Sequence, residues 1–194
     1  MAFKPDEYLF GGVNKKNATI WAVQKTSSLR INGASNVNKF GCEITQYYSP
    51  DTIFCSEENS VNKSVTLSGN MKIGIDNFDC HNHIITNDLR KTLKSSDYPY
   101  LIIHFLSLER KPNIANGKDS LKGCVDIQLG GITHRFELNY TFEKISQATF
   151  KLNGNRDFTF SDFKLEPPKK LGGIIKVKDS FTVDFSLTLI KVNQ

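Results

Sequence analysis

Ser-Phe-Thr-Val-Asp-Phe-Ser-Leu-Thr-Leu, at residues 180–189, is the stretch that decides the fold. Apolar and polar side chains alternate strictly along it, with Phe181 and Phe185 on the apolar side. A period of two is typical of a strand with one buried face and one face in water. Similar alternation recurs upstream between short turns, which favours an antiparallel barrel closed on itself. The interior of such a barrel is either a packed core or a binding cavity.

The expected fold class is all-β, an antiparallel barrel of about eight strands with one short helix. The helix is predicted over residues 87–94, with Thr86 as its N-cap and with Leu89 and Leu93 on one face. Gly69-Asn70 is expected to bend a long strand, and Asn153-Gly154-Asn155 is expected to form a hairpin turn. The predicted strands lie at residues 20–24, 28–33, 40–44, 65–75, 100–108, 124–129, 136–142, 150–152 and 180–189.

Length and composition favour one barrel domain over residues 1–194, with residues 1–18 as an irregular N-terminal segment. Hydrophobic residues make up 39% of the chain and charged residues 23%, which suits a soluble globular protein. The sequence has no apolar run long enough to span a bilayer, and its N-terminus lacks a signal-peptide pattern. From the residues alone, either a cytoplasmic protein or an exported one whose signal has been removed remains possible.

The formal net charge is a mild +5, and the notable cluster of lysines is Lys164, Lys169, Lys170, Lys176 and Lys178. Solvated loops are the favoured interpretation, and a weak attraction to anionic lipid headgroups is the alternative. Nucleic acid is not an expected partner, because no module combines basic and aromatic residues for that purpose.

Four cysteines, Cys42, Cys55, Cys80 and Cys124, allow three pairings. Cys42 and Cys55 flank a turn-like cluster at residues 48–51, so a bridge between them is possible if a hairpin forms there. Reduced, buried cysteines are the alternative. The absence of a C-x-x-C motif counts against a zinc knuckle or a thioredoxin-type site.

His81 and His83 are the candidate metal ligands, because on a strand both would point to one face. A third ligand is not evident, so surface histidines at a strand end are favoured, and we expect no metal and no cofactor. Serine, histidine and aspartate residues are present, but none lies in a nucleophile elbow. The sequence therefore predicts no catalytic residue and no enzymatic activity.

The order and spacing of several segments resemble the YceI-like family of bacterial lipid-binding proteins, in its Bacteroidetes-type branch. The resemblance runs from about Trp21 to Leu189, and no single motif in it is diagnostic. The matching segments are residues 28–33 (Ser-Leu-Arg-Ile-Asn-Gly), 36–42 (Asn-Val-Asn-Lys-Phe-Gly-Cys), 78–80 (Phe-Asp-Cys), 87–94, Tyr98-Pro99, 123–131 with Thr133, Asp162-Phe163, Pro167-Pro168 and 175–177 (Ile-Lys-Val).

This resemblance implies a lipocalin-like barrel that holds a long amphiphile, such as a polyisoprenoid, and it implies export to the periplasm. No catalytic residue is carried over from the family. The cysteines and the Phe-rich second half of the chain depart from the wider family pattern. The resemblance leaves the identity of the ligand and the oligomeric state open.

With this resemblance, the inward-facing residues are expected to line a ligand cavity, and a filled-core structural or interaction module of the cell envelope is the alternative. The loop at residues 166–173, with Pro167-Pro168 and Gly172-Gly173, is expected to border the cavity mouth. The candidate ligand-binding residues are Trp21, Ile31, Phe105, Phe136, Leu138, Phe158, Phe160, Phe163 and Phe185.

Overall fold

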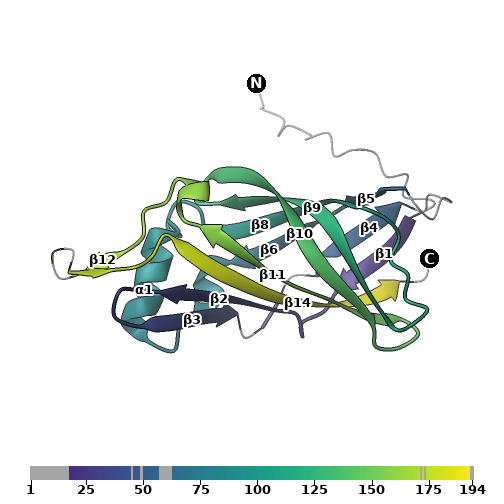
Figure 1. Cartoon of the computed structure of the whole chain (residues 1–194), viewed down its shortest axis with the longest axis horizontal. Coiled ribbons are helices and arrows are strands. Elements are labelled where there is room, and N and C mark those ends of the chain that lie inside the picture. Colours follow the sequence, from purple (N-terminus) through teal and green to yellow (C-terminus); the bar gives the residue numbers. More distant parts are fainter. Residues whose placement is uncertain are drawn as a thin grey trace, which may run out of the picture.

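The strands form a long sheet that closes into a barrel (Figure 1). The computed structural model describes residues 18–44, 46–48, 50–56, 63–170, 172 and 174–192. In chain order the elements are β1 (Ala18–Val23), β2 (Ser28–Ala34), β3 (Lys39–Ile44), β4 (Thr52–Ser56), β5 (Val65–Ser68), β6 (Asn70–Gly74), η2 (Ile75–Asn77), β7 (Phe78–Asp79), α1 (His83–Thr92), β8 (Tyr100–Leu108), β9 (Lys118–Leu129), β10 (Ile132–Lys144), β11 (Thr149–Thr159), η3 (Ser161–Phe163), β12 (Lys169–Lys170), β13 (Ile175–Lys176) and β14 (Ser180–Val192).

Eight antiparallel strands close the barrel in the order β1, β4, β5, β8, β9, β10, β11 and β14. The circle is completed by β1 against β14, where Ile20 lies opposite Val192 and Val23 lies opposite Leu189. Among the described residues, α1 is the one α-helix. The predicted all-β barrel with a single short helix is therefore confirmed. No helix in this part of the chain has the length and apolar character needed to cross a membrane.

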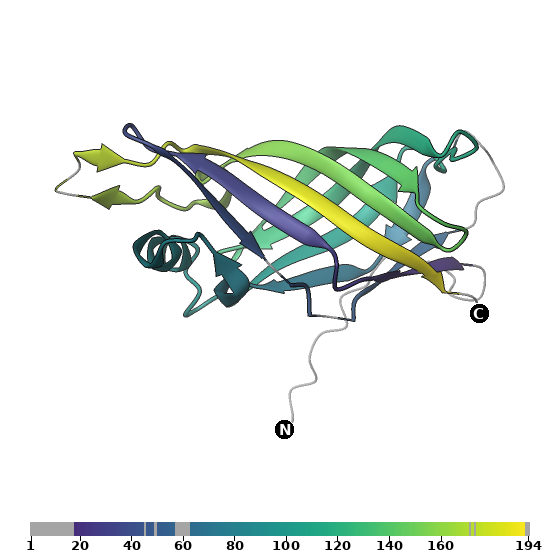
Figure 2. The ribbon, with the colours of Figure 1, turned by 90° about the horizontal axis from the view of Figure 1, so that it is seen from below.

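Strand β14 has different partners along its length, so the two ends of the barrel differ. Its last residues pair with β1, whereas its first half pairs with β2, where Val183 lies opposite Ile31. From β2 the sheet continues to β3 and β7. Figures 1 and 2 show α1 and the hairpin β12–β13 at one end, which we call the helix end, and β1 with the last residues of β14 at the other, which we call the β1 end.

Helix α1 begins four residues earlier than predicted. Asn82, not Thr86, is its N-cap, and the Asn82 side chain accepts hydrogen bonds from the backbone N–H groups of Ile84 and Ile85. Thr86 is buried, and its hydroxyl oxygen accepts a 3.0 Å hydrogen bond from the N–H of Cys80. Both residue types cap helices well, so the burial of Thr86 decides between them.

The turn predicted at Asn153-Gly154-Asn155 is wrong, because all three residues lie inside β11. Gly154 pairs with Phe185 of β14, and a Cβ atom on Gly154 would lie 2.3 Å from that ring. The glycine is there to make room for an aromatic side chain of the neighbouring strand. By contrast, the bend predicted at Gly69-Asn70 is confirmed: Gly69 separates β5 from β6 and has a φ of 145°, which favours glycine.

The cysteine pairing differs from the hairpin bridge considered above, because Cys42 forms a disulfide with Cys80. Strand β3 pairs with β7, with Glu43 opposite Asp79, whereas β4 pairs with β1 and β5. Cys42 therefore faces Cys80, and Cys55 on β4 lies elsewhere as a buried free thiol. The bridge fixes the chain that leads into α1 against the edge of the barrel wall.

Candidate functional site

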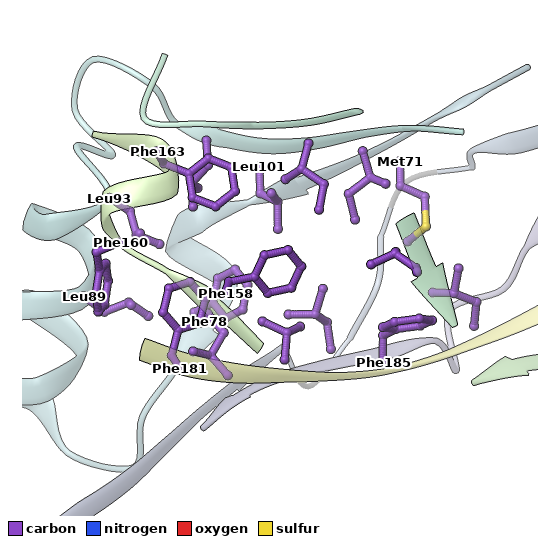
Figure 3. A pocket seen from close by; sticks show the side chains of 18 of the residues that line it. Met71, Phe78, Leu89, Leu93, Leu101, Phe158, Phe160, Phe163, Phe181 and Phe185 are labelled. Carbon is purple, nitrogen blue, oxygen red and sulfur yellow. The ribbon is translucent and has the colours of Figure 1, made fainter. Parts of the chain in front are cut away.

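An apolar cavity lies inside the barrel toward its helix end, and its volume is about 90 Å³ (Figure 3). Its walls come from the barrel strands β8, β9, β10, β11 and β14, from β2, β6 and β7, and from the elements that cover the helix end. Every lining residue is aliphatic, aromatic or methionine. They are Leu29, Ile31, Met71, Phe78, Leu89, Leu93, Leu101, Ile103, Phe105, Ile127, Leu129, Leu138, Tyr140, Phe158, Phe160, Phe163, Phe181, Val183, Phe185 and Leu187.

Strand β14 supplies one wall through the alternation that is visible in its sequence. Phe181, Val183, Phe185 and Leu187 all line the cavity. The residues between them point outward, because successive side chains of a strand alternate between its two faces. Asp184 is one of them, and its carboxylate accepts a 2.6 Å hydrogen bond from the Asn32 side chain of β2. Because one strand carries both faces, a shift of one residue in its register would bring charge into the cavity.

The helix end of the cavity is closed by side chains from two separate segments. Leu89 and Leu93 come from α1 and its C-cap, Phe163 comes from η3, and Phe160 comes from the residue that precedes η3 (Figure 3). The Phe160 ring lies 4.8 Å from the Phe181 ring, measured between centroids. These contacts are between apolar side chains and are not part of the strand ladder that closes the barrel.

At the β1 end the cavity stops at Phe105 and Tyr140. Both residues also line a second, nearly filled void of about 10 Å³, so they separate the two spaces. Beyond them Trp21 packs against Phe142, with ring centroids 5.2 Å apart. The β1 end of the barrel is therefore a packed core, and the space for a ligand lies on the other side of Phe105 and Tyr140.

Tyr140 carries the one hydroxyl group among the described residues that line the cavity. Burial raises the pKa of this phenol well above its ordinary value, with a smaller contribution from nearby Cys124. The phenol is therefore neutral at physiological pH. None of the described side chains that line the space is charged, which suits the hydrocarbon part of an amphiphile and does not suit an ion.

Seven of the nine predicted ligand-binding residues line this cavity, and two lie elsewhere. Trp21 lies in the packed core at the β1 end. Phe136 is buried but does not line the cavity; its ring packs edge-on against Phe158, with centroids 4.9 Å apart, and its centroid lies 5.0 Å from the guanidinium of Arg156. The seven are Ile31, Phe105, Leu138, Phe158, Phe160, Phe163 and Phe185.

Some of the lining residues that were not predicted do have a recognisable signal in the sequence. Phe181 and Val183 have the same parity as Phe185 in one alternating stretch, so they could have been included. Leu89 and Leu93 were predicted to share one face of a helix, and both residues line the cavity. Phe78 has no such signal, because β7 is a strand of two residues.

The histidines of the segment 81–83 form no metal site. His81 lies in a turn and its Nε2 atom is 2.9 Å from a carboxylate oxygen of Glu43, whereas His83 is the first residue of α1. The two side chains therefore do not share the face of a strand. In the described part of the chain, no group of three His, Cys, Asp or Glu side chains is placed to hold a metal ion.

A second depression of about 220 Å³, which we call the groove, lies outside the helix end. One side is α1, and the other is the β2–β3 turn with the hairpin β12–β13. Leu89 and Phe160 line both the groove and the cavity, so these two side chains lie between the two spaces. Pro168, from the loop predicted to border the cavity mouth, also lines the groove, while Leu171 and Gly173 lie outside the described residues.

An eight-stranded antiparallel barrel with an apolar interior and a helix across one end has the architecture of a lipocalin-like barrel. Within that class, the chain has the fold of the YceI proteins. A polyisoprenoid-binding domain from Saccharophagus degradans, implicated in plant cell wall breakdown, is similar with a TM-score of 0.63 at 10% identity, over 89% of this chain and 98% of that domain.

Two further solved structures have the same fold. BcnA from Burkholderia cenocepacia has a TM-score of 0.55 at 14% identity, over 84% of this chain and 95% of that one. A YceI protein from Campylobacter jejuni has a TM-score of 0.51 at 15% identity, over 66% of this chain and 73% of that one. The sequence matches no protein-family model and no curated protein. The YceI-like fold implied by the sequence is confirmed, and the Bacteroidetes-type branch stays a prediction.

Proposed function

We propose that this protein is a non-catalytic carrier that holds a long amphiphilic lipid of the polyisoprenoid type in its barrel. The observation that carries the proposal is the cavity itself, whose lining includes no charged side chain. Burial of the lipid tail would drive binding, at about 25 cal/mol per Å² of apolar surface, so an isoprene unit of five carbons contributes up to about 4 kcal/mol. The polyisoprenoid-binding domain that shares this fold supports the choice of ligand class.

The lining side chains must move for such a ligand to enter. At about 90 Å³, the cavity is smaller than the roughly 300–1,000 Å³ of pockets that hold drug-sized molecules. Seven phenylalanines line it, and rotation of rings such as Phe160 and Phe181 would widen it toward the helix end. We propose access at that end, because it is closed by side chains from α1 and η3 and not by a strand ladder.

The small volume also favours a second candidate, a filled-core structural or interaction module of the cell envelope. In that case the phenylalanines are the core of a barrel just wide enough for side chains to fill. The two functions differ in a measurable way, since a filled core retains no lipid and a carrier does.

Native mass spectrometry of protein purified without detergent tests the proposal. We expect co-purified lipid, or an added polyprenyl alcohol, to remain bound. Val183→Trp should reduce retention, because the indole would occupy the cavity next to Phe181. Ile190→Trp is the matched control, since Ile190 lies on the same strand and is exposed. The carrier function is wrong if the unaltered protein retains neither a co-purified lipid nor the added polyprenyl alcohol. It is also wrong if Val183→Trp and Ile190→Trp retain lipid equally.

We further propose that the protein works in the periplasm or another exported location. The Cys42–Cys80 disulfide supports this, because such bonds persist in oxidising compartments and are rare in the reducing cytosol.

A further inference from the structure

Three large apolar side chains are exposed together around the groove at the helix end. Val37 in the β2–β3 turn is 63% exposed, Ile84 in the first turn of α1 is 63% exposed, and Ile174 in the hairpin β12–β13 is 72% exposed. We call these three residues the apolar rim. Leaving three such side chains in water around a groove lined by apolar residues does not stabilise the fold. Clusters of exposed apolar side chains mark sites of contact with other molecules.

The hairpin and the turn that carry two of these residues are held together by Asn36. Its backbone N–H donates to the carbonyl of Lys176, its side-chain Oδ1 accepts from the N–H of Lys176, and its Nδ2 donates to the carbonyl of Ile174. A bridge between Ser35 and Val177 continues the pairing. These bonds hold the hairpin β12–β13, which carries Ile174, against the β2–β3 turn, which carries Val37. Figure 2 shows the two hairpins next to each other.

The net positive charge of the chain is concentrated in the segments that carry the apolar rim. Residues 34–40, 83–92 and 164–179 together contain eight Lys or Arg and three Asp or Glu, a net charge of +5. The whole chain has 25 and 20, so the remaining sequence holds 17 of each and is neutral. Lys39, Lys176 and Lys178 are exposed, and Asp88 is the one carboxylate that lines the groove in the described part of the chain.

From this arrangement we propose that the helix end docks on the surface of an anionic phospholipid bilayer. The apolar rim enters the headgroup region and the lysines meet the lipid phosphates. Exposed apolar side chains on a basic face are the combination by which peripheral proteins bind such surfaces. Docking would place the groove against the bilayer, with Leu89 and Phe160 between the lipid surface and the cavity. Docking extends the proposed carrier function. Its biological role rests on that function, whereas the contact between the helix end and the bilayer does not.

Co-sedimentation with vesicles tests the contact. We expect binding to vesicles of phosphatidylcholine and phosphatidylglycerol in equal parts, weaker binding to phosphatidylcholine alone, and loss of binding as salt is raised. The double variant Ile84→Glu/Ile174→Glu should weaken binding more than about tenfold. A glutamate in the first turn of α1 favours the helix, so misfolding of α1 does not explain such a loss. Lys176→Glu should cost at least about fivefold.

The matched controls, Ile145→Glu and Lys144→Glu, lie in and beside the β10–β11 turn near the β1 end. Ile145 is 52% exposed, and the adjacent Ala148 accepts a hydrogen bond from the N–H of Lys191 of β14. These variants should bind vesicles as the unaltered protein does. The inference is wrong if the unaltered protein does not bind the anionic vesicles, or if the rim variants and the controls bind equally.

Insertion can be followed directly with tryptophan reporters. Ile174→Trp should be quenched by brominated phosphatidylglycerol, and Ile145→Trp should not; equal quenching of both would also refute docking through the rim. Lipid retention of Ile84→Glu/Ile174→Glu, measured by native mass spectrometry, separates the two proposals. Retained lipid without vesicle binding leaves the carrier intact, whereas vesicle binding by a protein that never retains lipid overturns the carrier alone.

Discussion

Removing the Cys42–Cys80 disulfide should strongly destabilise the protein. The bridge joins β3 to the residue that follows β7 and spans a sequence separation of 38. In the chain-entropy model, a closed loop of that length lowers the entropy of the unfolded chain enough to contribute about 4 kcal/mol at 25 °C. Alanine is the proper replacement, because both cysteines are buried and a serine hydroxyl would add a buried polar group.

Urea denaturation of the unaltered protein and of Cys42→Ala/Cys80→Ala measures the effect. We expect the free energy of unfolding to fall by about 4 kcal/mol, with a melting temperature lower by roughly 8–16 °C for a chain of this length. The double variant Cys55→Ala/Cys124→Ala is the control, since it keeps the bridge, removes both described free thiols and loses only their packing.

Reductant provides an independent check on the same quantity. It should destabilise the unaltered protein and the Cys55/Cys124 variant, and it should leave the Cys42/Cys80 variant unchanged. A loss below about 1 kcal/mol on removing the bridge would refute the reasoning, because β3–β7 pairing would then hold this segment without a covalent tie.

Three further changes test other parts of the fold. Gly154→Ala should cost about 1–3 kcal/mol in urea denaturation, because its Cβ would meet the Phe185 ring, and an unchanged midpoint would contradict that packing. Asn82→Ala should cost about 1 kcal/mol and reduce helical circular dichroism, and unaltered stability would show that the cap is dispensable. Hydrogen bonds from Arg110 lower the pKa of the Asp119 carboxyl to about 2, with a further contribution from a backbone N–H. The unfolded state therefore takes up this proton first as the pH falls, so the stabilisation from Asp119 is present above about pH 4 and lost toward pH 2. The stability difference between the unaltered protein and Asp119→Asn should narrow over that range, and a constant difference would contradict the pairing.

The barrel could be predicted from the sequence because the signal for it is local. Alternation along residues 180–189 depends only on neighbouring side chains, and β14 follows it. The start of α1 could not be predicted, because Asn82 and Thr86 are both good caps. What separates them is the buried hydrogen bond that the Thr86 hydroxyl accepts from the N–H of Cys80. Local chemistry thus identified the helix but not its first residue.

The errors at Gly154 and at the cysteines have a common cause in strand pairing over long sequence distances. Asn-Gly is a strong turn signal, yet here the glycine accommodates Phe185, which lies 31 residues further along the chain. Cys42 meets Cys80 because β3 pairs with β7, and no spacing in the sequence shows that register. For the cavity, alternation shows which side chains face inward, but not that Trp21 lies beyond the residues that end the space.

Phe105 and Tyr140 form a partition that limits the depth of the cavity. In the proposed carrier, a lipid tail that enters from the helix end would advance only until it meets these two rings, so the depth of the cavity would set how many carbons are buried. We would then expect affinity to rise with each added unit for lipids shorter than this depth, and to stop rising for longer lipids, whose excess carbons stay outside the cavity. Selectivity for the chain length of the lipid would then follow from the position of Phe105 and Tyr140. A smaller residue at position 105 would deepen the cavity and shift that selectivity toward longer lipids.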